Sequence, residues 1–264
     1  MIGGRMLLAL DIGNTEITVG LIQGDDVRGH WRLTTNPDRT PDEWGVAIEA
    51  FLARAGHSPA EIRAACIASV VPGVTQSLVA AIRSAVTPRV GMVSATADLG
   101  VVLDVDEPLA VGPDRIANVI AALERHPGGC VVVDFGTATT FDCVTADGRF
   151  IGGAIMPGLR TSADQLVRRA AKLTATELVA PERAIGRRTD EHIRSGVLFG
   201  TADAIDGMVR RIRAEWPDSG TPRVVATGGL ASLIAPLTTS IDAVDADLTL
   251  HGLRIAAARL DLFA

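Results

Sequence analysis

The sequence predicts an α/β protein made of two similar halves, because one order of strands and helices occurs twice and a carboxylate-bearing turn recurs with it. Apolar runs bounded by turn residues indicate the strands, and apolar residues at helical spacing indicate the helices. The first half is expected to begin with three strands, at 7–13, 16–22 and 27–33. A helix from Pro41, a buried strand at 64–70 and a helix from Val74 to Val86 should follow. In the second half, three strands are expected at 130–136, 139–145 and 150–156. Helices should then dominate up to a further strand at 223–227.

Two repeated sequence features support an internal duplication. Asp11 and Asp134 each stand at the end of an apolar strand, in an Asp-x-Gly sequence that is soon followed by threonine. The segments 66–73 and 224–231 also correspond, since each runs from a strand into a tight turn and the start of a helix. Because both features occur in the same order, we predict two ribonuclease-H-like domains with a cleft between them. The predicted domains are residues 1–113 and 114–264.

Composition argues against several classes of protein. The net charge of the 264 residues is −6, whereas proteins that bind duplex nucleic acid carry basic surfaces that neutralise phosphates. No run approaches the roughly 18 apolar residues of a membrane span, so we expect a cytoplasmic protein without membrane association. Residues 1–5 precede the first strand and receive no role. Apolar, strand-like surroundings favour buried thiols over disulfides or metal ligands at Cys66, Cys130 and Cys143.

A P-loop is excluded because the only lysine, Lys172, has no glycine-rich stretch before it. The dinucleotide fingerprint Gly-x-Gly-x-x-Gly is also missing from the sequence. If the protein binds a nucleotide, a different device must hold the phosphates.

The turn after Asp11 is a candidate for that device. Gly13 can adopt a positive φ, and backbone amides helped by the Asn14 amide and the Thr15 hydroxyl could bind phosphate oxygens. A carboxylate repels phosphate unless a cation intervenes, so Asp11 is expected to hold hydrated Mg²⁺. Around Asp134, Thr137 and Thr139 are expected to act as Asn14 and Thr15 do in the first turn. The alternative is an ordinary hairpin turn, in which these residue types are also common.

Two further segments are candidates for ligand binding. Gly-Pro precedes Asp114 and Arg115 at a probable helix start, where an aspartate usually acts as a cap. The pair could instead supply a proton acceptor for a hydroxyl and a clamp for a carboxylate, which suits a hydroxy acid. Gly228-Gly229 would allow close approach of adenosine or its phosphates, or it is only a turn.

The chain resembles the type III pantothenate kinases, a family of the acetate kinase, sugar kinase and actin superfamily. The resemblance spans nearly the whole chain and implies an actin-like ATPase fold. It is carried by DIGNT (11–15), VGPDR (111–115), VVVDFGTATTFD (131–142), GGAIMPG (152–158), IGRRT (185–189), SG (195–196), ATGGLA (226–231) and DLTLHGL (247–253).

This resemblance implies a homodimer that phosphorylates pantothenate with ATP, the first step of coenzyme A biosynthesis. Asp114 would be the proton acceptor, and Asp134 would coordinate a monovalent cation, K⁺ or NH₄⁺. ATP would be bound by Asp11, Ile12, Gly13, Asn14, Thr15, Glu16, Ile17, Thr18 and Thr137. Pantothenate would be bound by Val105, Gly112, Pro113, Asp114, Arg115 and Thr189.

Three positions depart from the family pattern, one of which is Arg160, where a small or apolar residue is more usual. Pro113 replaces the usual alanine and removes a backbone donor, and Val105 stands where a tyrosine is common. These departures leave two alternatives to the kinase open. One is a catalytically weak, nucleotide-binding or regulatory relative, and the other is a different phosphotransferase of the same superfamily.

Overall fold

The computed structural model describes residues 6–170 and 172–264, so residues 1–5 lie outside the described part. The chain forms two compact units. Unit 1 comprises the chain up to Glu124 together with Asp247–Ala264, and unit 2 comprises Arg125–Ala246.

Unit 1 contains a sheet and the helices that cover its two faces. Its strands and helices are β1 (Met6–Ile12), β2 (Glu16–Gln23), β3 (Asp26–Thr34), α1 (Pro41–Arg54), η1 (Pro59–Glu61), β4 (Ile62–Ser69), α2 (Pro72–Ala85), β5 (Val90–Met92), β6 (Val102–Leu103), η2 (Pro108–Ala110), α3 (Pro113–Arg125) and α7 (Leu248–Arg259). Local sequence starts α1: Thr40 and Glu43 form a capping box, in which Thr40 N donates to Glu43 Oε2 over 2.8 Å.

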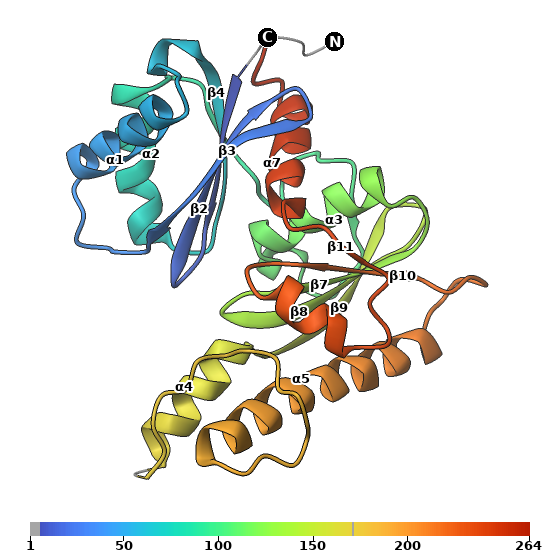
Figure 1. Ribbon diagram of the computed structural model, residues 1–264. Helices are drawn as coiled ribbons and strands as arrows, with labels where there is room; N and C mark the ends of the chain where they lie inside the picture. Colours follow the sequence, from blue (N-terminus) through green and yellow to red (C-terminus); the bar gives the residue numbers. More distant parts are fainter. Residues whose placement is uncertain (1–5, 171) are drawn as a thin grey trace. The chain divides into compact units, whose positions relative to one another are not determined.

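The sheet of unit 1 has the strand order β3-β2-β1-β4-β5. Helices α1 and α2 cover one face and α7 packs against β1 and β4 on the other (Figure 1). Between the sheet and α1 and α2 lies a core that includes fully buried Leu10, Trp44 and Leu78. Burial of these side chains is the main stabilising contribution to the unit.

Unit 2 contains β7 (Cys130–Phe135), β8 (Ala138–Val144), β9 (Arg149–Pro157), α4 (Leu159–Arg169), α5 (Thr189–Ala214), β10 (Arg223–Thr227), α6 (Ala231–Ile234), η3 (Ala235–Leu237) and β11 (Ala243–Val244). Its strands lie in the order β9-β8-β7-β10-β11. One face of this sheet packs against α5 and α6 through a core that includes Phe141, Leu198 and Ile234.

The two units repeat one strand order, since β9-β8-β7-β10-β11 matches β3-β2-β1-β4-β5 position by position. In each unit the first three strands form an antiparallel meander and the fourth strand pairs with the first in parallel. This repetition is the structural counterpart of the duplication that the sequence indicates. Every strand and helix start predicted above lies within about two residues of an observed element.

The division into units sets the predicted domain boundary in context. Residues 113 and 114 both belong to unit 1, because α3 packs with α7, where the Gly252 backbone lies close to Ala117. Helices α4 and α5 dominate between β9 and β10, as the sequence predicts, but residues 172–188 between them form an irregular segment. Pro181 and Gly186 lie in this segment and disfavour a helix.

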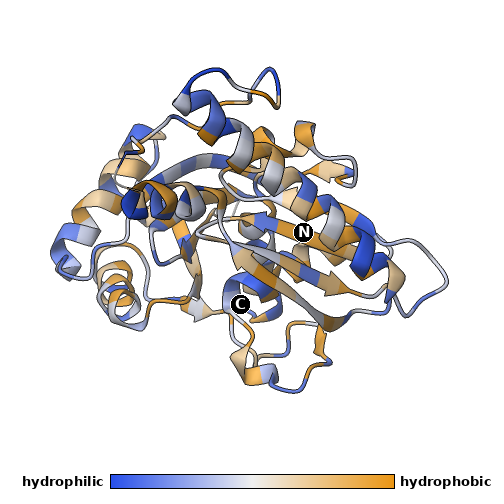
Figure 2. Cartoon of the chain, turned by 90° about the horizontal axis from the view of Figure 1, so that it is seen from below, coloured by the Kyte–Doolittle hydropathy of each residue, from blue (hydrophilic) through white to orange (hydrophobic). Residues whose placement is uncertain are grey.

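The hydropathy of the residues differs between the strands and the helices. Figure 2 shows hydrophobic residues along the strands, and both hydrophobic and hydrophilic residues along the helices. This mixture is typical of helices that cover a sheet on one side and meet solvent on the other. Among the described residues, no helix combines the length and the apolar character that crossing a membrane requires.

Candidate active site

The turn that follows β1 is positioned by the sheet of unit 1. Gly13 N donates to Glu16 O over 3.0 Å, which closes the turn, and Val70 N donates to Ile12 O over 3.1 Å. Asp11 is partly buried opposite Thr18, whereas residues 14–16 are exposed. The turn therefore presents its middle residues to solvent at the C-terminal end of β1, where a ligand can reach them.

Gly13 could adopt a positive φ, but in the structure it is not among the glycines with that conformation. A Cβ at this position would lie 3.0 Å from Glu16 O. A larger residue would press against the Glu16 carbonyl, so the tight closure of the turn, and not a left-handed backbone, favours glycine here.

The corresponding turn of unit 2 follows β7. Asp134 is partly buried, and its register partners are Thr140 on β8 and Thr227 on β10. Side chains of register partners lie on the same face of a sheet. Three oxygen-bearing side chains thus share one face at the end of three neighbouring strands.

Gly228 lies against this carboxylate. Its φ is +89°, and a Cβ there would lie 2.4 Å from Asp134 Oδ1 and 2.7 Å from Phe135 N. No other residue type fits without moving the end of β7, which makes Gly228 part of the site. The sequence left Gly228 open as a possible turn, and the signals for its role were its position in the repeat and the segment ATGGLA (226–231).

Thr139 does not share the face of Asp134, contrary to the sequence prediction. Thr139 pairs with Phe135 and is fully buried, so its side chain lies on the opposite face of the sheet. Alternation of side chains along β8 places Thr140 beside Asp134 instead. Thr137 is exposed in the turn itself.

Helix α3 begins at the predicted candidate base. Pro113 is its first residue, and Asp114 and Arg115 lie in the first turn, as the sequence predicts. Arg115 N donates to Asp114 Oδ1 over 2.9 Å. A Cβ on Gly112 would lie 2.4 Å from the same oxygen, so glycine leaves room for the carboxylate. Val105 is partly buried in the segment that precedes this helix.

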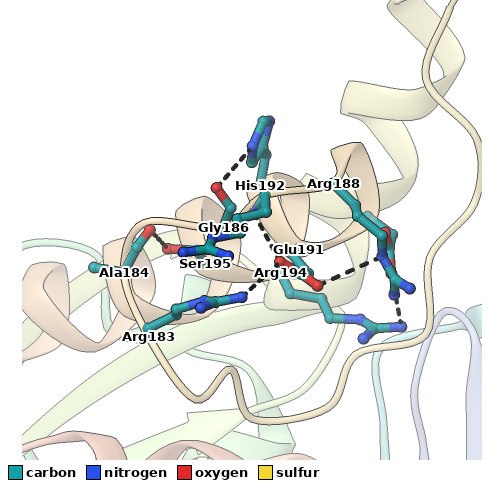
Figure 3. A network of polar contacts seen from close by, with 10 residues as sticks. Arg183, Ala184, Gly186, Arg188, Glu191, His192, Arg194 and Ser195 are labelled. Carbon is teal, nitrogen blue, oxygen red and sulfur yellow. Dashed lines mark hydrogen bonds and ion pairs between the residues drawn. The ribbon is translucent and has the colours of Figure 1, made fainter.

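Thr189 is the exposed first residue of α5, and the irregular segment before it is fastened to the same helix (Figure 3). Ser195 Oγ donates to Ala184 O over 2.6 Å. Glu191 Oε2 accepts from Arg187 N over 2.7 Å. This backbone donor is the main reason that the pKa of Glu191 lies below its usual value. Sequence analysis missed Glu191, which also pairs with two arginines, Arg183 and Arg188.

The predicted site residues divide between the units. Unit 1 contains the turn 11–18, Val105 and residues 112–115, and unit 2 contains Asp134, Thr137 and Thr189.

The cysteines are free and buried, as the sequence predicts. Burial raises the pKa of the Cys66 thiol to about 12 and that of Cys130 to about 12, so both are inert thiols near neutral pH. In the part of the chain that the structure describes, no three histidine, cysteine or acidic side chains cluster as metal ligands would.

Comparison with known proteins decides the family. Residues 7–211 match the family described as type III pantothenate kinase. The chain belongs to this family. It is 46% identical over 255 residues to the type III pantothenate kinase of Thermomicrobium roseum, and the match covers 97% of this chain and 98% of the relative. The chain is thus a kinase of coenzyme A biosynthesis, and the predicted family and enzyme class are confirmed.

Solved structures confirm the predicted fold class. The chain is similar to an activator of 2-hydroxyisocaproyl-CoA dehydratase from Clostridium difficile with bound ADPNP, with a TM-score of 0.60, 12% identity, and coverage of 98% of this chain and 96% of the other. It is also similar to MreB 5 of Spiroplasma citri bound to AMPPNP, with a TM-score of 0.54, 11% identity and coverage of 97% of each chain. These likenesses show two ribonuclease-H-like halves in an actin-like ATPase fold.

Proposed function

We propose that the chain transfers the γ-phosphoryl group of ATP to the primary hydroxyl of pantothenate, with Asp114 as the proton acceptor. The product is 4′-phosphopantothenate. The observation that carries this proposal is the match to a curated type III pantothenate kinase over 97% of the chain. The position of Asp114 in the first turn of α3 supports its role, because a partly buried carboxylate at a helix start can accept a proton from a bound hydroxyl.

Substrate binding is assigned residue by residue. The turn 11–18 and Thr137 bind ATP, and the exposed residues 14–16 and exposed Thr137 leave both turns accessible to it. Val105, residues 112–115 and Thr189 bind pantothenate, with the Arg115 guanidinium as a partner for its carboxylate. Pro113 is compatible with this role because proline suits the first position of a helix, where its missing amide has no helical partner.

The residues around Asp134 fit a cation. The hydroxyl of Thr227 is buried and has no hydrogen-bond partner among the described residues, and Thr227 is the register partner of Asp134. A carboxylate and a hydroxyl are hard oxygen donors, which suit K⁺ or a similar ion. Asp134 would hold the monovalent cation, and Asp11 would hold hydrated Mg²⁺. Bound cations offset the negative charge that spreads over the γ-phosphoryl oxygens.

Catalysis then depends mainly on alignment and charge stabilisation. Phosphoryl transfer passes through a loose transition state, in which the acceptor hydroxyl needs only late deprotonation. Asp114 orients the pantothenate hydroxyl and takes its proton, and the turn amides hold the phosphates in line with that oxygen.

The proposal includes a cytoplasmic homodimer. An apolar groove of about 330 Å³ between α4 and α5 offers a surface for a second copy of the chain, and it is open at Gly196 and Gly200, where a Cβ would meet no atom within 4 Å. Leu166 and Met156 also line this groove, and Leu166 is 42% exposed. A second copy of the chain could cover this surface. Sedimentation at micromolar concentration should give about twice the mass of 27.5 kDa.

The decisive experiment is a coupled assay of ADP release with ATP, Mg²⁺, K⁺ and pantothenate. The Asp114→Asn variant should lose activity about 10²- to 10⁴-fold, the usual contribution of general base catalysis. Asp203→Asn is the matched control, because Asp203 is exposed in the middle of α5. Full activity of Asp114→Asn would remove Asp114 from the role of base.

One measurement separates the proposal from its main alternative. If ATP raises the melting temperature of the wild type but no ADP is released with pantothenate, the chain is a nucleotide-binding relative without this activity. ADP release with another hydroxylated acid or a sugar would instead indicate a different phosphotransferase.

A further inference from the structure

Thr35 makes two hydrogen bonds to the Asp-x-Gly turn of unit 1. Thr35, the residue directly after β3, donates from its hydroxyl to Gly13 O over 2.6 Å. Its backbone amide donates to Thr15 O over 3.0 Å. Two carbonyl groups of the turn are thereby held by a partly buried residue about twenty positions away in sequence.

The turn of unit 2 is held by the equivalent segment. Gly158, the residue directly after β9, donates from its amide to Thr137 O over 3.1 Å. Thr161, in the first turn of α4, donates from its hydroxyl to the same oxygen over 2.7 Å. A Cβ on Gly158 would lie 2.5 Å from Gly136 O, so the two segments are in close contact.

The two arrangements correspond within the duplicated fold. β3 and β9 are the third strands of their units, and in both units a hydroxyl and an amide just after that strand engage carbonyls of the turn after the first strand. An isolated hydrogen bond of this kind is common in loops. The held carbonyls differ, since they are those of Gly13 and Thr15 in unit 1 and that of Thr137, the counterpart of Asn14, in unit 2. In both units, however, a threonine hydroxyl from the segment after the third strand holds the turn, and this recurrence indicates a shared role.

The geometry explains what this role is. A peptide unit is planar and trans, so the N–H of one residue points away from the carbonyl of the residue before it. When Thr35 holds Gly13 O, the amide of Asn14 is directed away from Thr35. Carbonyl oxygens repel phosphate and amides attract it, so fixing the carbonyls favours anion binding by the outer face of the turn.

We propose that Thr35 and Thr161 are positioning residues that hold the two Asp-x-Gly turns in their nucleotide-binding conformation. They contact the turns and not the substrates. This inference rests on the proposed binding of ATP to these turns, but it does not depend on which acceptor is phosphorylated.

The test compares Thr35→Val, which removes the hydroxyl at nearly constant volume, with Thr35→Ser, which keeps it. Thr34→Val is the matched control, because Thr34 is the exposed last residue of β3. Binding of a non-hydrolysable ATP analogue with Mg²⁺ is measured by calorimetry without pantothenate. KM for ATP, KM for pantothenate and kcat are measured separately, with the melting temperature as a check on folding.

Thr35→Val should raise the Kd of the analogue and KM for ATP about fivefold to tenfold, the effect of losing one hydrogen bond. KM for pantothenate should change less than about twofold, and Thr35→Ser and Thr34→Val should resemble the wild type. At Thr161, the valine variant should likewise have a higher Kd for the analogue than the serine variant and the wild type.

An unchanged Kd in Thr35→Val would overturn the inference, and so would a Kd in Thr35→Ser as weak as that of the valine variant. If Thr35→Val fails to fold, the comparison of Thr161→Val with Thr161→Ser gives the same test in unit 2, and an unchanged Kd in Thr161→Val would overturn the inference. A wild type that binds the analogue but does not turn over pantothenate would contradict the proposed function and leave the role of Thr35 intact.

Discussion

Replacement of Gly228 by alanine should damage unit 2 at the Asp134 turn. The left-handed backbone at φ +89° costs an L-residue about 1–2 kcal/mol. The new methyl group would also lie 2.4 Å from Asp134 Oδ1 and within 2.8 Å of the Phe135 backbone. The backbone of Phe135 cannot rotate away, so overpacking adds about 1–3 kcal/mol. We expect a loss of about 2–5 kcal/mol in the free energy of unfolding.

The assay is thermal unfolding followed by circular dichroism, together with pantothenate-dependent ADP release. For a chain of this length the expected loss lowers the melting temperature by about 4–20 °C. Activity should fall in the fraction that remains folded, because the methyl group displaces the Asp134 carboxylate.

Gly207→Ala is the matched control, because its Cβ would meet only Arg210 Nη2 at 3.7 Å in the interior of α5. Alanine is favoured over glycine in a helix by about 1 kcal/mol, so this variant should melt slightly higher than the wild type. If Gly228→Ala melts within about 2 °C of the wild type and keeps full activity, the close contact between Gly228 and Asp134 is refuted.

Two other substitutions test a close backbone contact in unit 1 and a hydrogen-bonded carboxylate in unit 2. In unit 1, Gly252→Ala would place a methyl group 2.0 Å from Ala117 O, where α7 approaches α3, and should destabilise the protein by about 1–3 kcal/mol in urea unfolding; an unchanged unfolding midpoint would count against this close approach. In unit 2, burial alone would raise the pKa of Asp206, but donors from Ser240 and Thr239 outweigh burial and lower it. A lowered folded-state pKa means that Asp206 stabilises the native state above about pH 4, the unfolded value, and that this stabilisation disappears as the pH falls through the folded value. Asp206→Asn should therefore cost about 1–3 kcal/mol at pH 7 and less at pH 3, and a difference that stays constant between these pH values would contradict the assignment.

Local patterns in the sequence were sufficient for the elements and for several site residues. Apolar runs ending in Asp-x-Gly predicted both β1 and β7 with their carboxylates at the C-terminal end. Proline before Asp114 predicted the start of α3, because proline suits the first turn of a helix. The order of the motifs along the chain also indicated the family.

Other parts of the site depend on contacts between residues far apart in sequence. Gly228 is next to Asp134 only because β10 pairs with β7, and Thr35 reaches Gly13 only because the meander returns the chain to the turn. The register of β8 against β7 decides that Thr140, and not Thr139, lies on the same face as Asp134, since a shift of one residue would exchange the faces.

The sequence by itself therefore determined the strands, the turns and the family, because their signals lie within short stretches of chain. Tertiary structure decided which carbonyls of a turn are held, which glycine must lack a side chain and with which unit α3 and α7 pack. Those features depend on strand pairing and close packing between distant segments, and a local pattern carries no record of either.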